Sequence, residues 1–524
     1  MKISLPSIIS SGMVLEKNAR IWGFCKDHND KTCVDISFCE KKYAADIKDG
    51  KWEVFISCDD YGGPYEMTIG DITLSDVYVG RVFMMSGQSN METPVSRVRT
   101  WYEDDFKDLV DNPRIRAFKV EKDFYFNNPR ENCIGSWNLI GPDTVDNFYA
   151  ISFYISKILE EAFDVPIGLI ECAVGGSRIE SWFCESDANF RGYTAALLRL
   201  CQREGYVERI TREDEDRTDK WYKNVRLNDI GLKEKYYSYD YNCSDWPTRP
   251  LTRNWSDDIG QVNGSVWFRK SFEVSDNMND IKGRLFFGTI ADSDIIYING
   301  HEVGQTEYRY PPRVYDIPEG IIQKGFNTIT IRVVSERGYG GFTKDKEYYF
   351  ETDSGSISLD GDWAYKIGFA AKELLPGTFF FNYPSGLFNA MLNPVLPYSI
   401  SAFLWYQGES NGEEPHDYDI LLSHHLKQMR KNYFPTLPFL VVQLPNFDAG
   451  PLNDNWQIIR EKQAAILNHP NTALIVTTDI GEDNDLHPIN KKDVAIRLAE
   501  GVLNLIRGDV IKSDKVFITG GNDD

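Results

Sequence analysis

Ser89 is the residue whose type and setting most directly suggest chemistry in this chain. It follows the continuous apolar run 82–85, which is typical of a strand buried on both faces, and Gly87 lies close by. A helix beginning there would direct free N–H groups and its positive dipole end toward a negative charge developing at the serine. The alternative is that Ser89 or Ser86 only caps that helix. The stretch lacks the GxSxG spacing of the α/β-hydrolase nucleophile.

Among the seven histidines, His487 has the setting that a general base for Ser89 needs. It follows an apolar strand and a run of acidic residues, and Pro488 restricts its backbone. The other six histidines are interpreted as surface or structural residues. A catalytic histidine usually has a carboxylate that holds its tautomer and stabilises the imidazolium. Asp485 and Glu409 both fit this role by type, and spacing does not choose between them.

Two further loops could stabilise an oxyanion. Gly175 and Gly176 follow the apolar strand 167–170, and a glycine pair lets backbone N–H groups approach a ligand closely. The alternative for this pair is an ordinary strand-to-helix turn. Gln407 ends the apolar run 402–406, and its amide could donate to the same oxyanion, unless it is a polar strand end that faces solvent.

Composition argues against several other classes of function. No His/Cys group has the spacing of a metal site, and no glycine-rich loop carries the P-loop lysine, so no metal or other cofactor is predicted. The formal net charge of −22 would repel nucleic acid and anionic membranes. No apolar run approaches the ~20 residues that cross a bilayer.

The cysteines and the first residues bear on the cellular compartment. Nine cysteines, an odd number without CxxC spacing, favour reduced thiols over a disulfide framework. The start of the chain has no apolar segment typical of a signal peptide, so a cytoplasmic location is expected. A secreted or periplasmic location would require a leader that precedes these residues. The sequence does not specify an oligomeric state.

Three kinds of segment must position the candidate residues. Residues 1–78 contain short alternating strands separated by Gly and Asp clusters, which predicts an Ig-like β-sandwich. Residues 79–202 and 363–524 alternate apolar strands with helical periodicity, which predicts a doubly wound α/β sheet with its reactive groups at the carboxyl ends of the strands. Residues 203–362 interrupt this pattern with a highly charged segment and new strands, which predicts an inserted β-sandwich.

Buried strands and two helices are expected at definite positions within the α/β segments. The strands are predicted from the apolar runs 82–85, 167–170, 402–406, 439–442 and 473–476. Helical periodicity predicts helices over about 147–162 and 491–506. Asn490 is the predicted N-cap of the second helix.

Together the four loops resemble those of the SGNH (GDSL-like) hydrolases, and more narrowly those of the sialate O-acetylesterase family and related carbohydrate acetylesterases, including acetyl-xylan esterases. The resemblance is carried, in family order, by residues 87–92, 175–182, 405–411 and 485–488, with further matches at 387–391 and 394–398. It implies a flavodoxin-like three-layer α/β hydrolase domain with an N-terminal β-sandwich. It also implies an inserted jelly roll that looks like the sugar-binding sandwich of some glycosidases.

The resemblance also implies roles for individual residues. Ser89 would be the nucleophile and His487 the base. The oxyanion donors would be Ser89 N–H, Gly176 N–H and the Gln407 amide. The expected substrate contacts are Gln88, Asn90, Arg178 and Asn389. The chain departs from the superfamily at Asn484, where relatives often place an acid, so the acid stays open between Asp485 and Glu409.

The expected reaction is the removal of O-acetyl groups from a carbohydrate by a serine esterase. A neutral, xylan-type saccharide is the expected substrate, because the acidic chain gives no long-range attraction for an anionic one. O-acetylated sialic acid is the alternative, and a local cation such as Arg178 would favour it. The sequence is also compatible with a non-catalytic carbohydrate-binding protein, or with a lipid or thioester hydrolase, although the chain has no obvious apolar lid for the latter.

Overall fold

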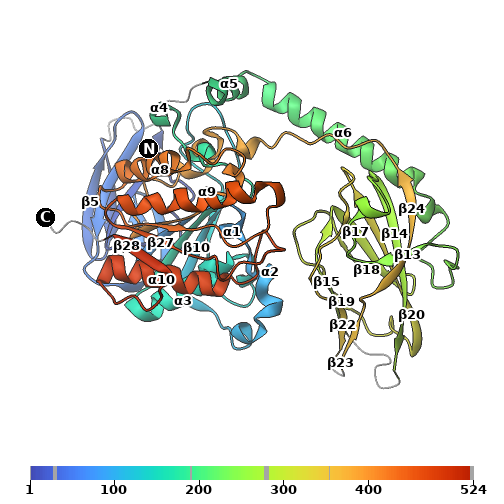
Figure 1. Ribbon diagram of the computed structural model, residues 1–524. Coiled ribbons are helices and arrows are strands. Elements are labelled where there is room, and N and C mark those ends of the chain that lie inside the picture. Colours follow the sequence, from blue (N-terminus) through green and yellow to red (C-terminus); the bar gives the residue numbers. More distant parts are fainter. Residues whose placement is uncertain (1, 27–31, 189–191, 276–282, 353–354, 520–524) are drawn as a thin grey trace. The chain divides into compact units, whose positions relative to one another are not determined.

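The chain divides into two compact units in the computed structural model, which describes residues 2–26, 32–188, 192–275, 283–352 and 355–519 (Figure 1). The first unit comprises Met1–Tyr206 and Phe379–Asp524, and the second comprises Val207–Thr378. All four loops that carry the candidate chemistry belong to the first unit.

One eight-stranded sheet organises the first unit, in the order β11-β10-β12-β9-β25-β26-β27-β28. Its six inner strands are parallel, and each edge strand runs antiparallel to its neighbour. The mixed α/β class predicted from the sequence is confirmed. The strands are β9 (Arg81–Gly87), β10 (Asn112–Val120), β11 (Gly135–Ile140), β12 (Ile167–Ala173), β25 (Ala402–Tyr406), β26 (Phe439–Val442), β27 (Thr472–Ile475) and β28 (Val516–Thr519).

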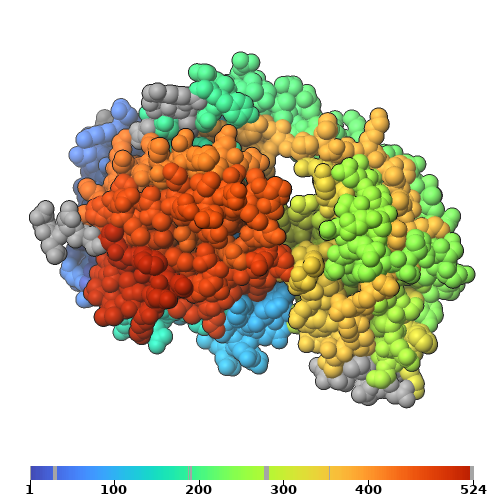
Figure 2. Space-filling view, in the orientation of Figure 1, coloured from blue at the N-terminus to red at the C-terminus, as the bar shows by residue number. Residues whose placement is uncertain are grey.

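Helices cover both faces of this sheet, which explains why central strands such as β25 and β26 are apolar and buried at every position. Phe83 and Met85 of β9 share a core with α3 (Ala150–Phe163) and α10 (Lys491–Arg507). Met84, between them, belongs to the opposite core, with α8 (Tyr418–Asn432) and α9 (Asn453–Ala464). Helices α8, α9 and α10 form the orange-to-red face of this unit in the ribbon and space-filling views (Figures 1 and 2).

The predicted cap of the last helix is confirmed. The Asn490 side-chain oxygen accepts a hydrogen bond from the Asp493 N–H at 3.1 Å, and α10 begins at the next residue. This cap fixes the start of α10 at Lys491, four residues after the predicted base, His487. The shorter helices of the unit are α1 (Ser89–Glu92), α2 (Val95–Val98), α4 (Glu185–Ala188) and α5 (Gly192–Cys201).

The N-terminal strands form two small sheets whose core is continuous with the α/β part of the unit. Ile21 and Met67 belong to the same buried cluster as Trp405 of the central sheet. The three-stranded sheet contains β1 (Lys2–Ser4), β3 (Asn18–Lys26) and β6 (Lys51–Ser57). The five-stranded sheet contains β2 (Val14–Leu15), β4 (Cys33–Phe38), β5 (Lys41–Asp46), β7 (Gly62–Ile69) and β8 (Ile72–Val79).

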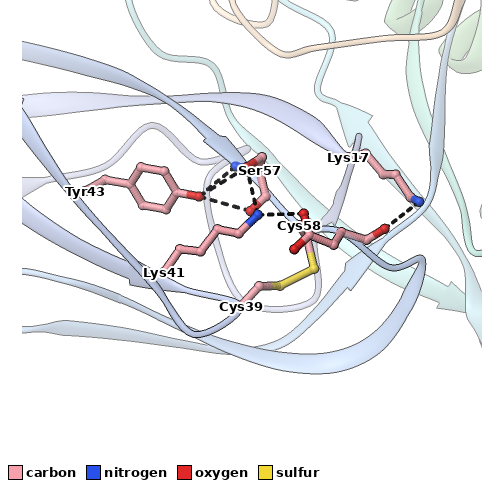
Figure 3. The surroundings of a disulfide bond; sticks show 7 residues. Lys17, Cys39, Lys41, Tyr43, Ser57 and Cys58 are labelled. Carbon is pink, nitrogen blue, oxygen red and sulfur yellow. Dashed lines mark hydrogen bonds and ion pairs between the residues drawn. A yellow bond between two sulfur atoms is a disulfide. The ribbon is translucent and has the colours of Figure 1, made fainter.

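A disulfide joins Cys39 to Cys58, which corrects the expectation of reduced thiols (Figure 3). Cys39 lies in the turn between β4 and β5, and Cys58 directly follows β6, so their Cα atoms are 5.7 Å apart. Close by, Lys41 Nζ pairs with Asp59 Oδ1 at 2.7 Å. The cysteine count could not reveal this pair, because the strand register brings the two residues together. Free thiols remain at Cys25, Cys33, Cys133, Cys172, Cys184, Cys201 and Cys243.

The second unit is a long charged helix followed by antiparallel sheets on a shared apolar core. Val266 and Ile331 of the six-stranded sheet share a core with Leu285 and Phe350 of the four-stranded sheet. The six-stranded sheet has the order β13-β24-β14-β20-β17-β18, the four-stranded sheet has the order β19-β15-β22-β23, and β16 pairs with β21.

The inserted unit extends beyond residue 362, where the sequence pattern placed its end. Strand β24 (Asp362–Ala370) pairs with β14 (Gly264–Val274), and its Trp363 is buried in the core of this unit. The other elements are α6 (Tyr206–Asn228), α7 (Ile230–Lys233), β13 (Thr248–Pro250), β15 (Gly283–Phe287), β16 (Ile290–Ala291), β17 (Ser293–Ile298), β18 (His301–Thr306), β19 (Val314–Ile317), β20 (Gly325–Ser335), β21 (Gly341–Phe342), β22 (Tyr348–Thr352) and β23 (Gly355–Ser358).

Candidate active site

The strand register brings three of the four loops to the same point of the sheet edge. Gly87, the last residue of β9, pairs with Ala173 of β12 on one side and with Tyr406 of β25 on the other. A Cβ at Gly87 would lie 2.1 Å from the Tyr406 carbonyl oxygen, and the backbone φ of Gly87 is +138°. Only glycine therefore lets β25 approach β9 closely enough to place the three loops together.

Ser89 is the first residue of α1 and does not cap it. The N-cap position is Gln88, without a side-chain capping bond, so the helix-cap alternative is wrong for Ser89. The Ser89 Oγ instead lies 2.8 Å from Nε2 of His487, a residue 398 positions away. Ser86 lies within β9, and its hydroxyl is buried without a hydrogen-bond partner in the described residues.

His487 is mostly buried, and its surroundings favour the neutral imidazole. Burial lowers the pKa of His487 well below its ordinary value, and the positive charges of Arg97 and Lys491 lower it further. A neutral imidazole can accept the serine proton at neutral pH, as a general base must. The pair therefore has the distance and the protonation state that an activated serine needs.

Both candidate acids lie near His487, but they hold it differently. Asp485 Oδ1 accepts a hydrogen bond from the His487 backbone N–H at 2.8 Å, and it lies 3.9 Å from Arg97 Nη2. Glu409 Oε1 accepts from Asn90 Nδ2 at 2.6 Å, and the same Nδ2 donates to the Leu486 carbonyl at 3.1 Å. Asp485 thus holds the histidine loop directly, whereas Glu409 acts through Asn90.

We expect Asp485→Asn to lower kcat more than Glu409→Gln does. An asparagine at this position could still accept the bond from the His487 N–H, but it lacks the negative charge that stabilises an imidazolium, and loss of a triad carboxylate typically lowers kcat about 10⁴-fold. For Glu409→Gln, one hydrogen bond further away, we expect a loss of about tenfold. Steady-state kinetics of both variants on an aryl acetate make the comparison. The reverse order would identify Glu409 as the carboxylate that acts on the imidazole.

The glycine pair forms a loop against Ser89. Gly175 N–H donates to Glu92 Oε1 at 2.9 Å, and a Cβ built on Gly175 would lie 3.2 Å from the Ser89 Cβ. Gly176 has a φ of +75°, which favours glycine. In the described part of the chain, neither Ser89 N–H nor Gly176 N–H meets a protein acceptor. Both are therefore available to an oxyanion beside the serine.

Gly175→Ala is expected to lower kcat about 10²-fold with little change in KM. The added Cβ would lie 2.7 Å from Glu92 Oε1 and 3.2 Å from the Ser89 Cβ, so it would displace the Glu92 side chain that anchors this loop and crowd the serine. Steady-state kinetics, with the unfolding temperature as a check on the fold, measure this effect. The matched control is Gly377→Ala, whose Cβ would meet only Asp214 among the described residues, at 3.8 Å. Equal kcat for Gly175→Ala and the natural protein would exclude a catalytic role for this loop.

Gln407 does not have the contacts expected of the predicted oxyanion donor. Its buried amide nitrogen donates to the Ser177 carbonyl at 3.0 Å and to Asn411 Oδ1 at 2.8 Å, so both amide hydrogens are used within the protein. The Tyr418 hydroxyl donates to its oxygen at 2.7 Å. Gln407 therefore holds the glycine loop in place.

The four predicted substrate contacts also have partners within the protein. Gln88 Oε1 accepts from Gly408 N–H at 3.4 Å and from Ser410 N–H at 3.3 Å. Asn90 is fully buried, so its side chain positions the loops and does not face substrate.

Asn389 and Arg178 are also engaged elsewhere. Asn389 is 1% exposed and donates to the Asn127 carbonyl at 2.9 Å, which corrects its assignment as a substrate contact. Arg178 pairs with Glu414 at 2.7 Å and lies 3.6 Å from Glu180, so its charge is compensated.

Three residues that support the site were not predicted from the sequence. Glu92 anchors Gly175, Asn411 accepts from the Ile179 N–H at 3.0 Å as well as from Gln407, and Lys491 contacts Asn90. Glu92 and Asn411 lie inside the motifs that carry the family resemblance, so those motifs could have identified them. Lys491 is a charged residue in a helix start, and no sequence pattern distinguishes it from a solvent-facing lysine.

No metal position or membrane span is found in the described residues. No group of three or more His, Cys, Asp and Glu side chains in these ranges could hold a metal ion. None of the helices within them has the length and apolar character needed to cross a bilayer.

The fold and the Ser89–His487 pair define a centre of the serine-hydrolase type at the carboxyl edge of an α/β sheet. The family model described as carbohydrate esterase, sialic acid-specific acetylesterase, matches residues 79–210 and 380–503, about half of the chain. These two stretches are similar to that family of carbohydrate esterases, which confirms the resemblance inferred from the four motifs. The inserted unit lies between them in the sequence.

Similar proteins extend this comparison. The sialate O-acetylesterases of Mus musculus and Rattus norvegicus are 27% and 25% identical over 207 residues, which cover 34% of this chain. The aligned residues span only 36% of those relatives. A crystal structure of a carbohydrate acetylesterase from Xanthomonas citri matches 97% of this chain and 77% of its own, with a TM-score of 0.57 and 20% identity. That likeness shows a shared fold.

Proposed function

We propose that this protein is a serine esterase that removes O-acetyl groups from carbohydrates. The single observation that carries the proposal is the 2.8 Å contact between Ser89 Oγ and His487 Nε2, next to a glycine loop whose Gly176 N–H meets no acceptor among the described residues. The match of two stretches of the chain to a carbohydrate esterase family supports the substrate class. A non-catalytic carbohydrate-binding protein would not need a nucleophile, a neutral base and free N–H donors at one point.

The mechanism has two acyl-transfer steps. His487 takes the proton of Ser89 as Oγ attacks the acetyl carbonyl, and the N–H groups of Ser89 and Gly176 stabilise the tetrahedral oxyanion. His487 then protonates the sugar oxygen, which leaves with the carbonyl–oxygen bond broken. Water then attacks the acetyl-serine as His487 takes its proton, and His487 returns that proton to Ser89 Oγ as the acyl–oxygen bond breaks and acetate leaves.

A neutral saccharide, such as an acetylated xylo-oligosaccharide, is our proposed substrate. This choice is supported by the pairing of two cations near the site with carboxylates of the protein itself. Arg178 is paired with Glu414, and Lys122 Nζ lies 2.9 Å from Glu92 Oε2. Each of these charges is thus compensated within the protein, and neither adds an uncompensated attraction for a sialate carboxylate.

The finer fold assignments are part of the same proposal. Parallel inner strands with helices on both faces support a flavodoxin-like SGNH layering for the first unit. Two antiparallel sheets around one core support a jelly roll for the inserted unit.

Acetate release tests both the reaction and the substrate. The purified protein is incubated with acetylated xylo-oligosaccharide and, separately, with O-acetylated sialic acid, and acetate is measured enzymatically. We expect higher kcat/KM on the neutral substrate and no release by Ser89→Ala. Faster release from sialic acid would overturn the substrate proposal, and sugar binding without any acetate release would overturn the esterase proposal.

A further inference from the structure

We propose that Lys491 is a positioning residue of this site, whose ammonium fixes the serine, histidine and Glu409 loops in one arrangement through the Asn90 side chain. The inference rests on the proposed esterase function, which supplies its kinetic readout. It assigns a role to a buried cation that the acyl-transfer steps themselves do not use.

The side-chain amide of Asn90 connects all three loops by hydrogen bonds. Lys491 Nζ donates to Asn90 Oδ1 at 2.6 Å. On its other side, Asn90 Nδ2 donates to Glu409 Oε1 at 2.6 Å and to the Leu486 carbonyl at 3.1 Å. Asn90 directly follows Ser89, and Leu486 directly precedes His487. Since the amide is held from both ends, the relative positions of the serine and histidine depend on the lysine.

Helix stability does not explain a lysine at this position. Lys491 is the first residue of α10, where the positive end of the helix dipole disfavours a cation. Its side chain is also 1% exposed, so its charge has lost most of its hydration. The neighbouring Lys492 shows the ordinary arrangement, because it is partly exposed and pairs with Asp105 at 2.8 Å.

The charged groups that face Lys491 come from several elements. Burial and Arg97 lower the pKa of Lys491 to about 7, whereas the negative charges of Asp485, Glu409 and Glu482 raise it. Burial also raises the pKa of Glu409 to about 7, against the influence of Asn90 and Lys491. The ammonium and the carboxylate thus stabilise each other's charged form across Asn90.

The same ammonium acts on the base. A positive Lys491 disfavours the imidazolium and thereby contributes to the lowered pKa of His487. Removing that charge should raise the pKa of His487. The imidazole would then become protonated, and inactive as a base, at a higher pH. The acidic limb of kcat/KM should therefore move to higher pH, a change that a purely structural lysine would not produce.

The test compares Lys491→Met with Lys491→Arg in the full chain on an aryl acetate across pH. For Lys491→Met we expect kcat to fall about 10²-fold through misplacement of the serine and histidine. We also expect KM to change less than about threefold. The acidic limb of the pH profile of kcat/KM should move to a pH at least about half a unit higher. Lys491→Arg keeps the charge and should leave the limb in place. Lys492→Met is the matched control and should behave like the natural protein.

An unchanged kcat, or a lower kcat without a shift of the acidic limb, would overturn the proposal. If Lys491→Met does not fold, Lys491→Gln is measured with the same readouts and the same expected shift. NMR titration of the His487 imidazole separates this inference from the proposed function. A protein without esterase activity in which Lys491→Gln still raises the His487 pKa would contradict only the function, and an unchanged pKa would contradict the role of Lys491.

Discussion

Ser89→Ala is expected to reduce kcat on an acetyl ester by about 10⁶-fold, because it removes the atom that forms the covalent intermediate. KM should change little, since the side chain is small and the surrounding loops are held by other contacts. Gln88 N–H, for instance, donates to the Tyr406 carbonyl at 2.9 Å and fixes the turn without Ser89. Acetate release and aryl ester hydrolysis measure the loss.

Ser86→Ala is the matched control for this substitution. Ser86 lies three residues earlier, and its buried hydroxyl has no hydrogen-bond partner in the described chain, so its removal should leave kcat within about twofold. Turnover by Ser89→Ala at more than about a hundredth of the natural rate would contradict the assignment of the nucleophile.

His487→Gln is expected to have an effect of similar size. Without the imidazole, the serine proton has no acceptor, and loss of the base alone typically lowers kcat about 10⁶-fold. The exposed His416 provides the control, because His416→Gln changes a histidine of the Glu409 loop region without touching the pair. Steady-state kinetics at neutral pH measure kcat for both variants, and only His487→Gln should lose activity.

The double variant Ser89→Ala/His487→Gln should be no slower than either single variant. The two side chains act as one unit, so once one is lost the other contributes nothing further. Independent contributions would instead multiply, which would mean that the 2.8 Å contact between Ser89 Oγ and His487 Nε2 has no catalytic meaning.

The mixed α/β class was predictable because burial on both faces leaves a direct signal in the sequence. Phe83 and Met85 face one core and Met84 faces the other, so these successive positions of β9 must all be apolar. The extent of the inserted unit was less predictable. Strand β24 continues the chain past residue 362 without a break in composition, and its pairing with β14 and the burial of Trp363 in the core of the insert assign it to that unit.

Within the site, residue types were easier to predict than their contacts. Ser89 and His487 could be singled out from their motifs, although 398 positions separate them. Gln407 carries the right group for an oxyanion donor, but its direction is set by Ser177 and Asn411. Asn389 belongs to a matching motif, yet packing buries it completely away from substrate. Such orientations depend on the folded loops.

Contacts between distant segments were the least predictable. The disulfide between Cys39 and Cys58 depends on how the turn after β4 meets the end of β6, and no cysteine spacing encodes that register. Lys491 meets Asn90 because α10 starts beside α1, a consequence of the sheet order. Neither residue type nor periodicity predicts such a contact between distant residues.

Trapping of the acyl-enzyme tests the central claim most directly. The protein is mixed with an activated acetyl ester, quenched with acid during the first turnover, digested and analysed by mass spectrometry. We expect one acetyl group on Ser89, and none in Ser89→Ala. Active protein that carries no acetyl group on Ser89, or that carries it on another residue, would contradict the assignment of Ser89 as the nucleophile.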